Sequence, residues 1–198
     1  MSDEIRRISG RAIPMPGDDI DTDRITPARF LTALTFTGME KALFCDEREH
    51  TPDHPIDNSD YKGAKFLFVG KNFGSGSSRE HAPQAIKRYG IDAIVGISFA
   101  EIFAGNSQAI GMPLMTASPE AVQRLIALTQ KKPKTEYTAD LESLTVSWGG
   151  ESVAVEMLEE RRQSFLKGNW NVVAILRSNL PRVREVAEKL PYVNNFQA

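Results

Sequence analysis

Short apolar runs alternate with helical patterns in the middle of the chain. Residues 65–69 (Lys-Phe-Leu-Phe-Val) and 93–97 are apolar and rich in β-forming residues, which predicts two buried strands. Between them, residues 82–89 have the spacing of a helix that Gly90 would end. A strand, a helix and a second strand in this order predict a βαβ crossover and hence parallel pairing.

The pattern also predicts elements on both sides of this unit. Near the N-terminus, residues 5–13 form a candidate strand that Pro14 would stop. Gly149 and Gly150 separate two strand-like runs, which predicts a hairpin. Residues 46–61 are polar and contain prolines, so we expect a surface loop there. The remaining predicted elements are helices over 98–111, 119–131, 158–167 and 181–190, a strand over 113–116, and an element over 172–176 that fits either type.

Length and composition are those of an ordinary globular protein. The chain has 198 residues, enough for one domain with a sizeable core, and is 41% hydrophobic and 25% charged. A formal net charge of −2 gives no general attraction to nucleic acid or to a membrane surface. The first residues lack the apolar stretch of a signal peptide, and no apolar run could span a bilayer. We therefore expect a cytoplasmic protein that binds neither nucleic acid nor membrane.

The cysteine and histidine content restricts the metal chemistry of this chain. Cys45 is the single cysteine, which excludes an internal disulfide and an iron–sulfur cluster held by this chain alone. The histidines, at positions 50, 54 and 81, lack the spacing of known metal motifs. We expect any metal centre to come from another chain.

A glycine-rich turn follows the first strand of the predicted crossover. Residues 70–81 are Gly-Lys-Asn-Phe-Gly-Ser-Gly-Ser-Ser-Arg-Glu-His, at the carboxyl end of that strand, where open α/β sheets place their ligands. Gly74 and Gly76 allow backbone N–H groups to approach a ligand closely. The serines, the arginine and the histidine that follow add hydrogen-bonding and charged groups. The turn is a candidate anion site that also carries candidate catalytic groups.

The turn matches none of the common glycine-rich motifs. A dinucleotide-binding loop would need glycine where Arg79 stands, and the spacings of a P-loop and a nucleophile elbow are absent. Ser77 and Glu80 have the spacing of a capping box, in which Ser77 is only a helix N-cap. Pro83 favours a helix that begins near residue 82, which would leave Ser77 in the loop. The residues alone leave both alternatives open.

A short acidic run precedes the turn in the sequence. Asp19, Asp21 and Asp23 have the alternate spacing of a calcium loop, but Arg24 and Phe30 stand where such a loop needs glycine and glutamate. Calcium is therefore not expected. The spacing favours aspartates that cap their own backbone. The alternative is that Asp23 orients a group in a site shared with the glycine-rich turn.

Four stretches of the sequence together resemble a known family. The segment from Phe73 to Pro83 (Phe-Gly-Ser-Gly-Ser-Ser-Arg-Glu-His-Ala-Pro) is similar to the signature of the aconitase swivelling-domain superfamily. It is most similar to the small-subunit family of 3-isopropylmalate dehydratases, and residues 21–31, 37–44 and 97–103 agree with that family in the expected order. The resemblance covers roughly residues 10–120 and weakens beyond.

The resemblance implies a fold and a domain organisation. The fold class would be α/β: an aconitase-like swivelling domain, which is a three-layer β/β/α sandwich with a mixed, partly parallel sheet. Residues 1–198 would form a single swivelling domain. Its core would cover about residues 10–120, followed by a C-terminal hairpin and helices over about 120–198.

The resemblance also implies roles for individual residues. Ser77 matches the serine whose alkoxide removes a proton next to a substrate carboxylate, and Arg79 matches the arginine that binds a carboxylate through its planar fork. Asp23 matches an aspartate that orders the charged groups of the site. The other expected site residues are Gly76, Ser78, Leu31 and Leu34 for substrate binding, and His81 and Glu80 for support. None of them is expected to bind a metal.

The segment after Asp23 bears on substrate choice. In relatives that act on tricarboxylates, an arginine there pairs the extra carboxylate, whereas residues 30–38 contain no basic residue. The apolar side chains of this segment suit an isopropyl group. Arg24 and Arg29 precede the segment and are the basic groups that could reach the substrate.

The family's reaction implies a partner. It is the isomerisation of 2-isopropylmalate and 3-isopropylmalate by dehydration and rehydration in leucine biosynthesis, a hydro-lyase activity on a hydroxy-diacid. The chain itself would bind no cofactor, and a large subunit would carry a [4Fe-4S] cluster in a heterodimer or a larger hetero-oligomer. One alternative is the small subunit of a related hydro-lyase, of the homoaconitase, citramalate or dimethylmalate type. The other is a non-catalytic module that binds carboxylate or phosphate.

Overall fold

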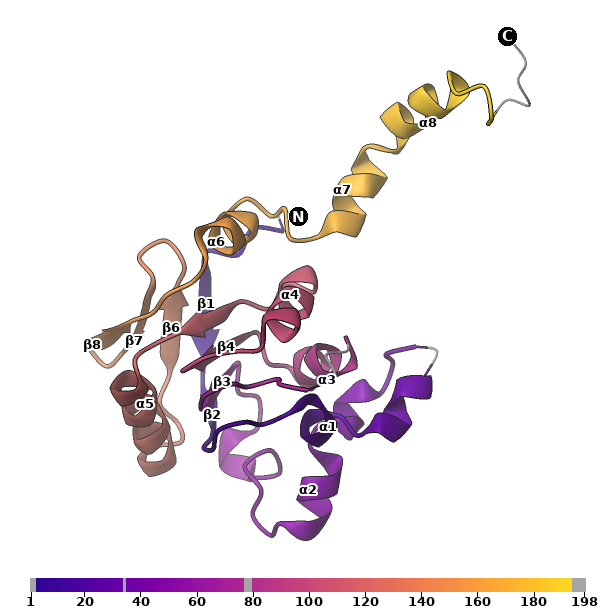
Figure 1. Ribbon diagram of the computed structural model, residues 1–198. Coiled ribbons are helices and arrows are strands. Elements are labelled where there is room, and N and C mark those ends of the chain that lie inside the picture. The colour runs from indigo at the N-terminus through magenta and orange to yellow at the C-terminus, as the bar shows by residue number, and fades with distance from the viewer. Residues whose placement is uncertain (1–2, 34, 77–79, 194–198) are drawn as a thin grey trace.

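Two β-sheets and a set of helices form a layered α/β structure (Figure 1). The computed structural model describes residues 3–33, 35–76 and 80–193. One four-stranded sheet is parallel, with the order β2-β3-β4-β5, and the other is antiparallel, with the order β1-β6-β7-β8. The strands are β1 (Arg7–Gly10), β2 (Ala12–Met15), β3 (Phe66–Val69), β4 (Ala93–Gly96), β5 (Leu114–Thr116), β6 (Tyr137–Asp140), β7 (Thr145–Trp148) and β8 (Glu151–Ala154).

Helices connect the parallel strands, as the sequence pattern predicts. The central crossover is confirmed, because β3 and β4 pair in parallel on either side of α3, which Gly90 caps with a φ of +112°. The α-helices are α1 (Thr22–Ile25), α2 (Cys45–His50), α3 (His81–Tyr89), α4 (Glu101–Ala109), α5 (Pro119–Lys131), α6 (Glu159–Leu166), α7 (Val172–Ser178) and α8 (Leu180–Glu188). Three 3-10 helices, η1 (Ala28–Thr32), η2 (Met39–Ala42) and η3 (Ser59–Tyr61), lie in the segment between β2 and β3.

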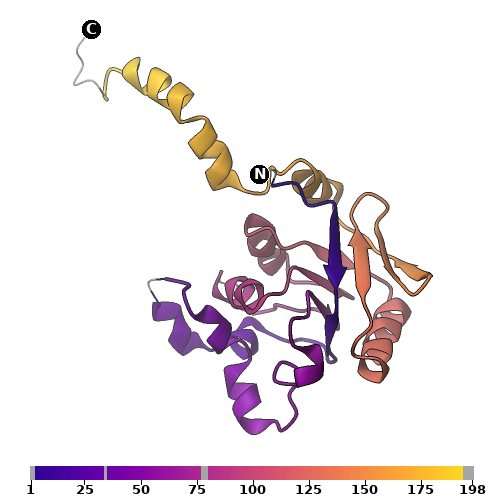
Figure 2. The same cartoon turned by 180° about the vertical axis from the view of Figure 1, so that it is seen from behind.

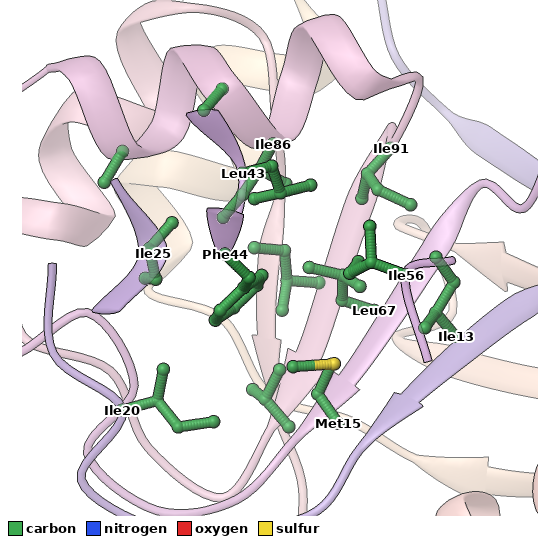
Figure 3. Packing of buried hydrophobic residues seen from close by; sticks show 14 of the residues in the cluster. Ile13, Met15, Ile20, Ile25, Leu43, Phe44, Ile56, Leu67, Ile86 and Ile91 are labelled. Atoms are coloured by element: carbon green, nitrogen blue, oxygen red, sulfur yellow. The ribbon is translucent and has the colours of Figure 1, made fainter. Parts of the chain in front are cut away.

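Alternate side chains of the parallel strands enter two different cores. On β3, Leu67 and Val69 pack with residues of α3 and of the segment before β3, in the core that Figure 3 shows. Phe66 and Phe68 point the other way and pack against the antiparallel sheet and α5. Every residue of β3 is therefore buried, as the continuous apolar run predicts.

These two cores define three layers. Helices α3 and α4 and the elements between β2 and β3 cover one face of the parallel sheet, and the antiparallel sheet covers the other (Figures 1 and 2). The expected α/β class and the β/β/α sandwich are confirmed. The expected sheet combined parallel and antiparallel strands. In the structure these strands form two separate sheets, one parallel and one antiparallel, that pack face to face.

The N-terminal strand differs from the prediction of a single strand over residues 5–13. The chain forms β1 in the antiparallel sheet and then β2 in the parallel sheet, with Gly10 at φ +153° just before the change. Pro14 lies within β2 and does not stop it. Because β2 is an edge strand of the parallel sheet, the missing N–H of Pro14 need not interrupt the pairing with β3.

The prediction of a surface loop over residues 46–61 is wrong in part. This segment contains α2 and η3, and the side chains of His54, Ile56 and Tyr61 are buried. The buried imidazole of His54 accepts a hydrogen bond at Nδ1 from the Ile56 backbone N–H, at 3.2 Å. The sequence pattern does not predict these contacts, because isolated buried residues in a polar segment leave no periodic pattern.

The C-terminal part contains the predicted hairpin and helices. Strands β7 and β8 pair on either side of Gly149 and Gly150. The ambiguous element is the helix α7, and the Asn171 side chain caps it by accepting a hydrogen bond from the Ala174 N–H at 3.0 Å. Both views show α7 and α8 projecting away from the layered body (Figures 1 and 2). Of the helices in the described ranges, none is long and apolar enough to cross a membrane.

Candidate active site

Three segments that are distant in the sequence lie side by side where strands β2, β3 and β4 end. The backbone N–H of Gly74 donates to the Ile20 carbonyl at 2.8 Å, and the N–H of Thr22 donates to the Ser75 carbonyl at 2.9 Å. On the other side, the Phe73 N–H donates to the Ser98 carbonyl at 3.1 Å. The glycine-rich turn is therefore held between the acidic run and the segment that leads into α4.

Two glycines of this turn, Gly74 and Gly76, are required by its geometry. Gly74 has a φ of +79°, and a Cβ atom built on it would lie 2.3 Å from Cγ of Phe103. Gly76 has a φ of +88°, and its Cβ would lie 3.5 Å from Cβ of Asp21. Both positions need left-handed backbone, and Gly74 also needs the absence of a side chain. The sequence pattern predicts close approach of a ligand at these glycines, whereas the group that lies against Gly74 is the Phe103 side chain.

The aspartates of the acidic run fix the turn and the short helix α1. Asp21 caps α1 by accepting the Arg24 N–H at 2.8 Å, as the preferred capping interpretation predicts. Asp18 accepts the Lys71 N–H, and Asp19 accepts the Asn72 side-chain amide, each at 2.7 Å. Local spacing in the sequence does not predict these two hydrogen bonds, because the partners of each lie 53 residues apart.

One of the predicted catalytic residues, Asp23, lies beside this junction. Asp23 is exposed on α1, two residues after the aspartate that borders Gly76. Ser77, Ser78 and Arg79 lie outside the described residues. Since α3 begins at His81, these three residues precede the helix, which is the arrangement that Pro83 favoured.

The two expected support residues flank the start of α3. Glu80 is exposed at the N-cap position, and its carboxylate accepts a hydrogen bond from the Gln84 amide at 2.9 Å. The ring of His81 contacts Phe36 edge-on, with the ring centroids 5.1 Å apart. Both ring nitrogens of His81 are buried and have no hydrogen-bond partner within the part of the chain that the structure describes. The sequence does not predict that Phe36 contacts His81, because 45 residues separate them.

The segment expected to meet the substrate's variable group follows α1. Leu31 is half-buried in η1, and Leu34 lies outside the described residues. The two basic groups near this segment are held elsewhere: Arg24 Nε donates to the Glu47 carboxylate at 2.5 Å, and Arg29 forms a two-pronged ion pair with Asp46.

The thiol of Cys45 belongs to the same ion-pair cluster. It accepts a hydrogen bond from Arg29 at 3.3 Å, and burial raises its pKa. The hydrogen bonds from Arg29 lower the pKa of the neighbouring Asp46 carboxyl. Across residues 3–33, 35–76 and 80–193, no group of three or more His, Cys, Asp or Glu side chains could hold a metal ion.

Fold and site together define a class of protein. It is a β/β/α sandwich with a glycine-rich turn at the carboxyl edge of its parallel sheet. Comparison with known proteins agrees, because residues 3–119 match the aconitase C-terminal domain family.

The relatives identify the family more closely. The 3-isopropylmalate dehydratase small subunit of Synechocystis sp. is 44% identical over 96% of both chains. A small subunit of the same name from Thermus thermophilus is 43% identical over 97% of this chain and 98% of its own. A crystal structure of 3-isopropylmalate dehydratase from Methanocaldococcus jannaschii superposes with a TM-score of 0.66 at 25% identity, covering 90% of this chain and 99% of that one. The chain therefore belongs to the aconitase C-terminal domain family and, within it, to the family of 3-isopropylmalate dehydratase small subunits.

Proposed function

We propose that this chain is the small subunit of a 3-isopropylmalate dehydratase and works only in complex with a large subunit. The observation that carries the proposal is the identity of 44% to a small subunit of that name over 96% of both chains. The complex would interconvert 2-isopropylmalate and 3-isopropylmalate in leucine biosynthesis, in the cytoplasm. All 198 residues would act as one swivelling domain that presents the glycine-rich turn to the partner.

Proton transfer is the step that we assign to this chain. Ser77, as the alkoxide, takes a proton from the carbon next to a substrate carboxylate while hydroxide leaves the neighbouring carbon and a C=C bond forms. Adding water back with the opposite orientation completes the isomerisation. A serine anion needs stabilisation, and converging N–H groups beside a guanidinium would supply it. The exposed backbone of Gly76, which has no side chain and directly precedes Ser77 in the sequence, supports this assignment.

The remaining site residues would bind and order the substrate. Arg79 binds a carboxylate through two parallel N–H groups, assisted by Ser78 and the backbone of Gly76. The exposed carboxylate of Asp23 orders these charges from α1. The further assignments are Leu31 and Leu34 against the isopropyl group, and His81 and Glu80 as support.

The departing hydroxide requires chemistry that we place on the partner. Loss of hydroxide from carbon needs a Lewis acid, and we assign this role to a [4Fe-4S] cluster on the large subunit. The chain's single cysteine supports this division, because cluster ligation needs several thiolates.

Reconstitution tests the proposal. The purified chain is mixed with the large subunit of the same organism, and hydration of isopropylmaleate is followed by the loss of its ultraviolet absorbance. We expect turnover from the mixture and none from either chain alone. Turnover on a homoaconitate, citramalate or dimethylmalate substrate instead would identify a related hydro-lyase. Binding of a dicarboxylate without turnover would identify a non-catalytic module.

A further inference from the structure

The last two helices expose an unusual amount of apolar surface. Residues 172–193, here called the C-terminal arm, comprise α7, α8 and the turn after them. Nine large apolar side chains of the arm are at least one-third exposed: Val172, Val173, Ile175, Leu176, Leu180, Val183, Val186, Tyr192 and Val193. In the rest of the described chain, the exposed large apolar side chains are Ile102 and Leu158. Exposed apolar side chains gathered in this number on a projecting element indicate an interaction site.

The apolar residues of the arm follow the spacing of a helix-packing seam. Val173 and Leu176 lie three residues apart on α7, and Leu180, Val183, Ala187 and Leu190 succeed one another at steps of three or four residues over α8 and the turn after it. On α8, the seam borders a hollow of about 460 Å³, lined by Asn179, Arg182, Val183, Val186, Ala187 and Leu190. This side of the arm can therefore pack against a complementary apolar surface.

The charge of the arm argues against pairing with a second arm. The basic residues Arg177, Arg182, Arg184 and Lys189 outnumber the acidic Glu185 and Glu188, although the whole chain has a net charge of −2. Two paired arms would bring these like charges together, which is unfavourable. A surface that covers the arm should instead have an apolar floor and an acidic rim.

The attachment of the arm directs it away from the candidate active site. Trp170 anchors its base, where the indole N–H donates to the Asp3 carbonyl at 2.6 Å and the ring lies against Gly111. Gly111 lies between the end of α4 and the start of β5, and therefore at the amino edge of the parallel sheet. The glycine-rich turn lies at the carboxyl edge. The arm therefore offers a contact surface separate from the one around the site.

The comparisons indicate why a second contact surface is needed. The family that matches residues 3–119 is named for a C-terminal domain, which is tethered to the rest of its protein, and the arm lies outside the match. The relatives that match nearly the whole chain are named small subunits. A short tether supplies an effective concentration of about millimolar, and a separate chain must replace it with additional interface.

We propose that the C-terminal arm docks into an apolar, acidic-rimmed groove of the large subunit and holds the two chains together. This inference rests on the proposed function. The arm contributes affinity, and the site residues at the opposite edge contribute the chemistry. Loss of the arm surface should therefore weaken assembly without changing the rate of the assembled enzyme.

Substitutions on the seam test the proposal. Leu176→Glu and Val183→Glu are both exposed, so each variant should keep the thermal stability and circular dichroism of the unmodified chain. Ser178→Glu adds the same charge to the exposed side of α7 as a matched control. Binding to the purified large subunit is titrated by biolayer interferometry at several salt concentrations, and kcat is measured at saturating small subunit.

The outcomes separate this inference from the proposed function. We expect Kd to rise at least about tenfold for each seam variant and less than about twofold for the control, with kcat at saturation unchanged. Binding by the unmodified chain should also weaken as the salt concentration rises.

Unaltered Kd values in the seam variants would overturn the role of the arm but not the proposed function, and a loss of kcat at saturation would do the same. A dimer of the isolated chain that the seam variants convert to monomer would assign the arm to a second copy and overturn the proposal. Absence of binding by the unmodified chain would overturn the proposed function, and this inference with it.

Discussion

The ring of His81 packs edge-on against Phe36, with the ring centroids 5.1 Å apart and an interplanar angle of 74°. Both imidazole nitrogens are buried at this contact, and neither meets a hydrogen-bond partner among the described residues. Buried polar groups usually find partners, so we expect these two nitrogens to meet a partner outside the described residues.

His81→Phe tests this relationship. The phenyl ring keeps the contact with Phe36 and removes two buried polar atoms that have no partner among the described residues, so the free energy of unfolding should stay the same or rise by up to about 1 kcal/mol. In the reconstituted enzyme, kcat/KM should fall at least about tenfold. His50→Phe, at an exposed position on α2, is the control and should leave kcat/KM unchanged. Full activity in His81→Phe would show that this histidine only fills space.

Ser77→Ala should remove turnover while leaving assembly intact. The variant lacks the proposed base but keeps the proposed carboxylate ligand Arg79. Positioned bases contribute about 10²–10⁴-fold, so we expect kcat to fall within that range with little change in Kd for the large subunit. Ser75→Ala, on the same turn, is the matched control. A loss of less than about tenfold in Ser77→Ala would remove Ser77 from the role of base.

The assembled enzyme should prefer isopropylmalate to homocitrate or citrate. Arg24 already pairs with Glu47 and Arg29 with Asp46, so both guanidinium groups have carboxylate partners within the chain. Leu34→Arg should narrow the preference, measured as the ratio of kcat/KM values, by supplying a partner for that carboxylate. Thr32→Arg, on the exposed surface of η1, serves as a comparison for added charge alone. Equal kcat/KM for isopropylmalate and a tricarboxylate in the unmodified enzyme would contradict the assignment.

Gly74→Ala should destabilise the chain far more than Gly63→Ala. Both glycines have a φ of +79°, but a Cβ at Gly63 meets only Arg11, at 3.7 Å, whereas at Gly74 it meets the Phe103 ring at 2.3 Å. Backbone strain should therefore cost about 1 kcal/mol at either position, and the clash should add about 2 kcal/mol at Gly74 alone. Chemical denaturation measures both values. Similar losses at the two positions would show that the turn can move away from Phe103.

Stability should fall as pH drops below about 6.5, the ordinary pKa of histidine. Burial lowers the pKa of His54, outweighing the nearby Glu47 carboxylate, so the imidazole stays neutral in the folded chain. Between about pH 6.5 and the lower pKa of the folded state, the unfolded chain binds the extra proton, and the free energy of unfolding decreases by at most about 1.4 kcal/mol per pH unit.

His54→Asn provides the comparison for this pH dependence. The amide oxygen can still accept the Ile56 N–H, but the side chain does not titrate. Denaturation of both chains between pH 7.5 and 5.5 should show a smaller slope in the variant. Equal slopes would assign the pH dependence to other groups.

Local sequence patterns determined much of this fold. The continuous apolar run of β3, the glycine after α3 and the Ser118 cap of α5 each depend on residues within one turn or one strand. The use of glycine at position 74 also has a local cause, because a positive φ in a tight turn favours glycine, but the contact with Phe103 depends on the tertiary structure. The family signature then added roles for residues that spacing alone left open.

Tertiary structure decided the partners of the side chains. The ion pairs of Arg24 and Arg29 and the contact between His81 and Phe36 join segments that are far apart in the sequence. The first predicted strand is divided between two sheets, which its sequence pattern does not show. Periodicity shows that a side chain is buried or exposed, but it carries no information on which distant residue lies opposite. The exposed seam of the arm is the clearest case, because its apolar positions predict burial, and only the folded chain shows that the body leaves α7 and α8 uncovered.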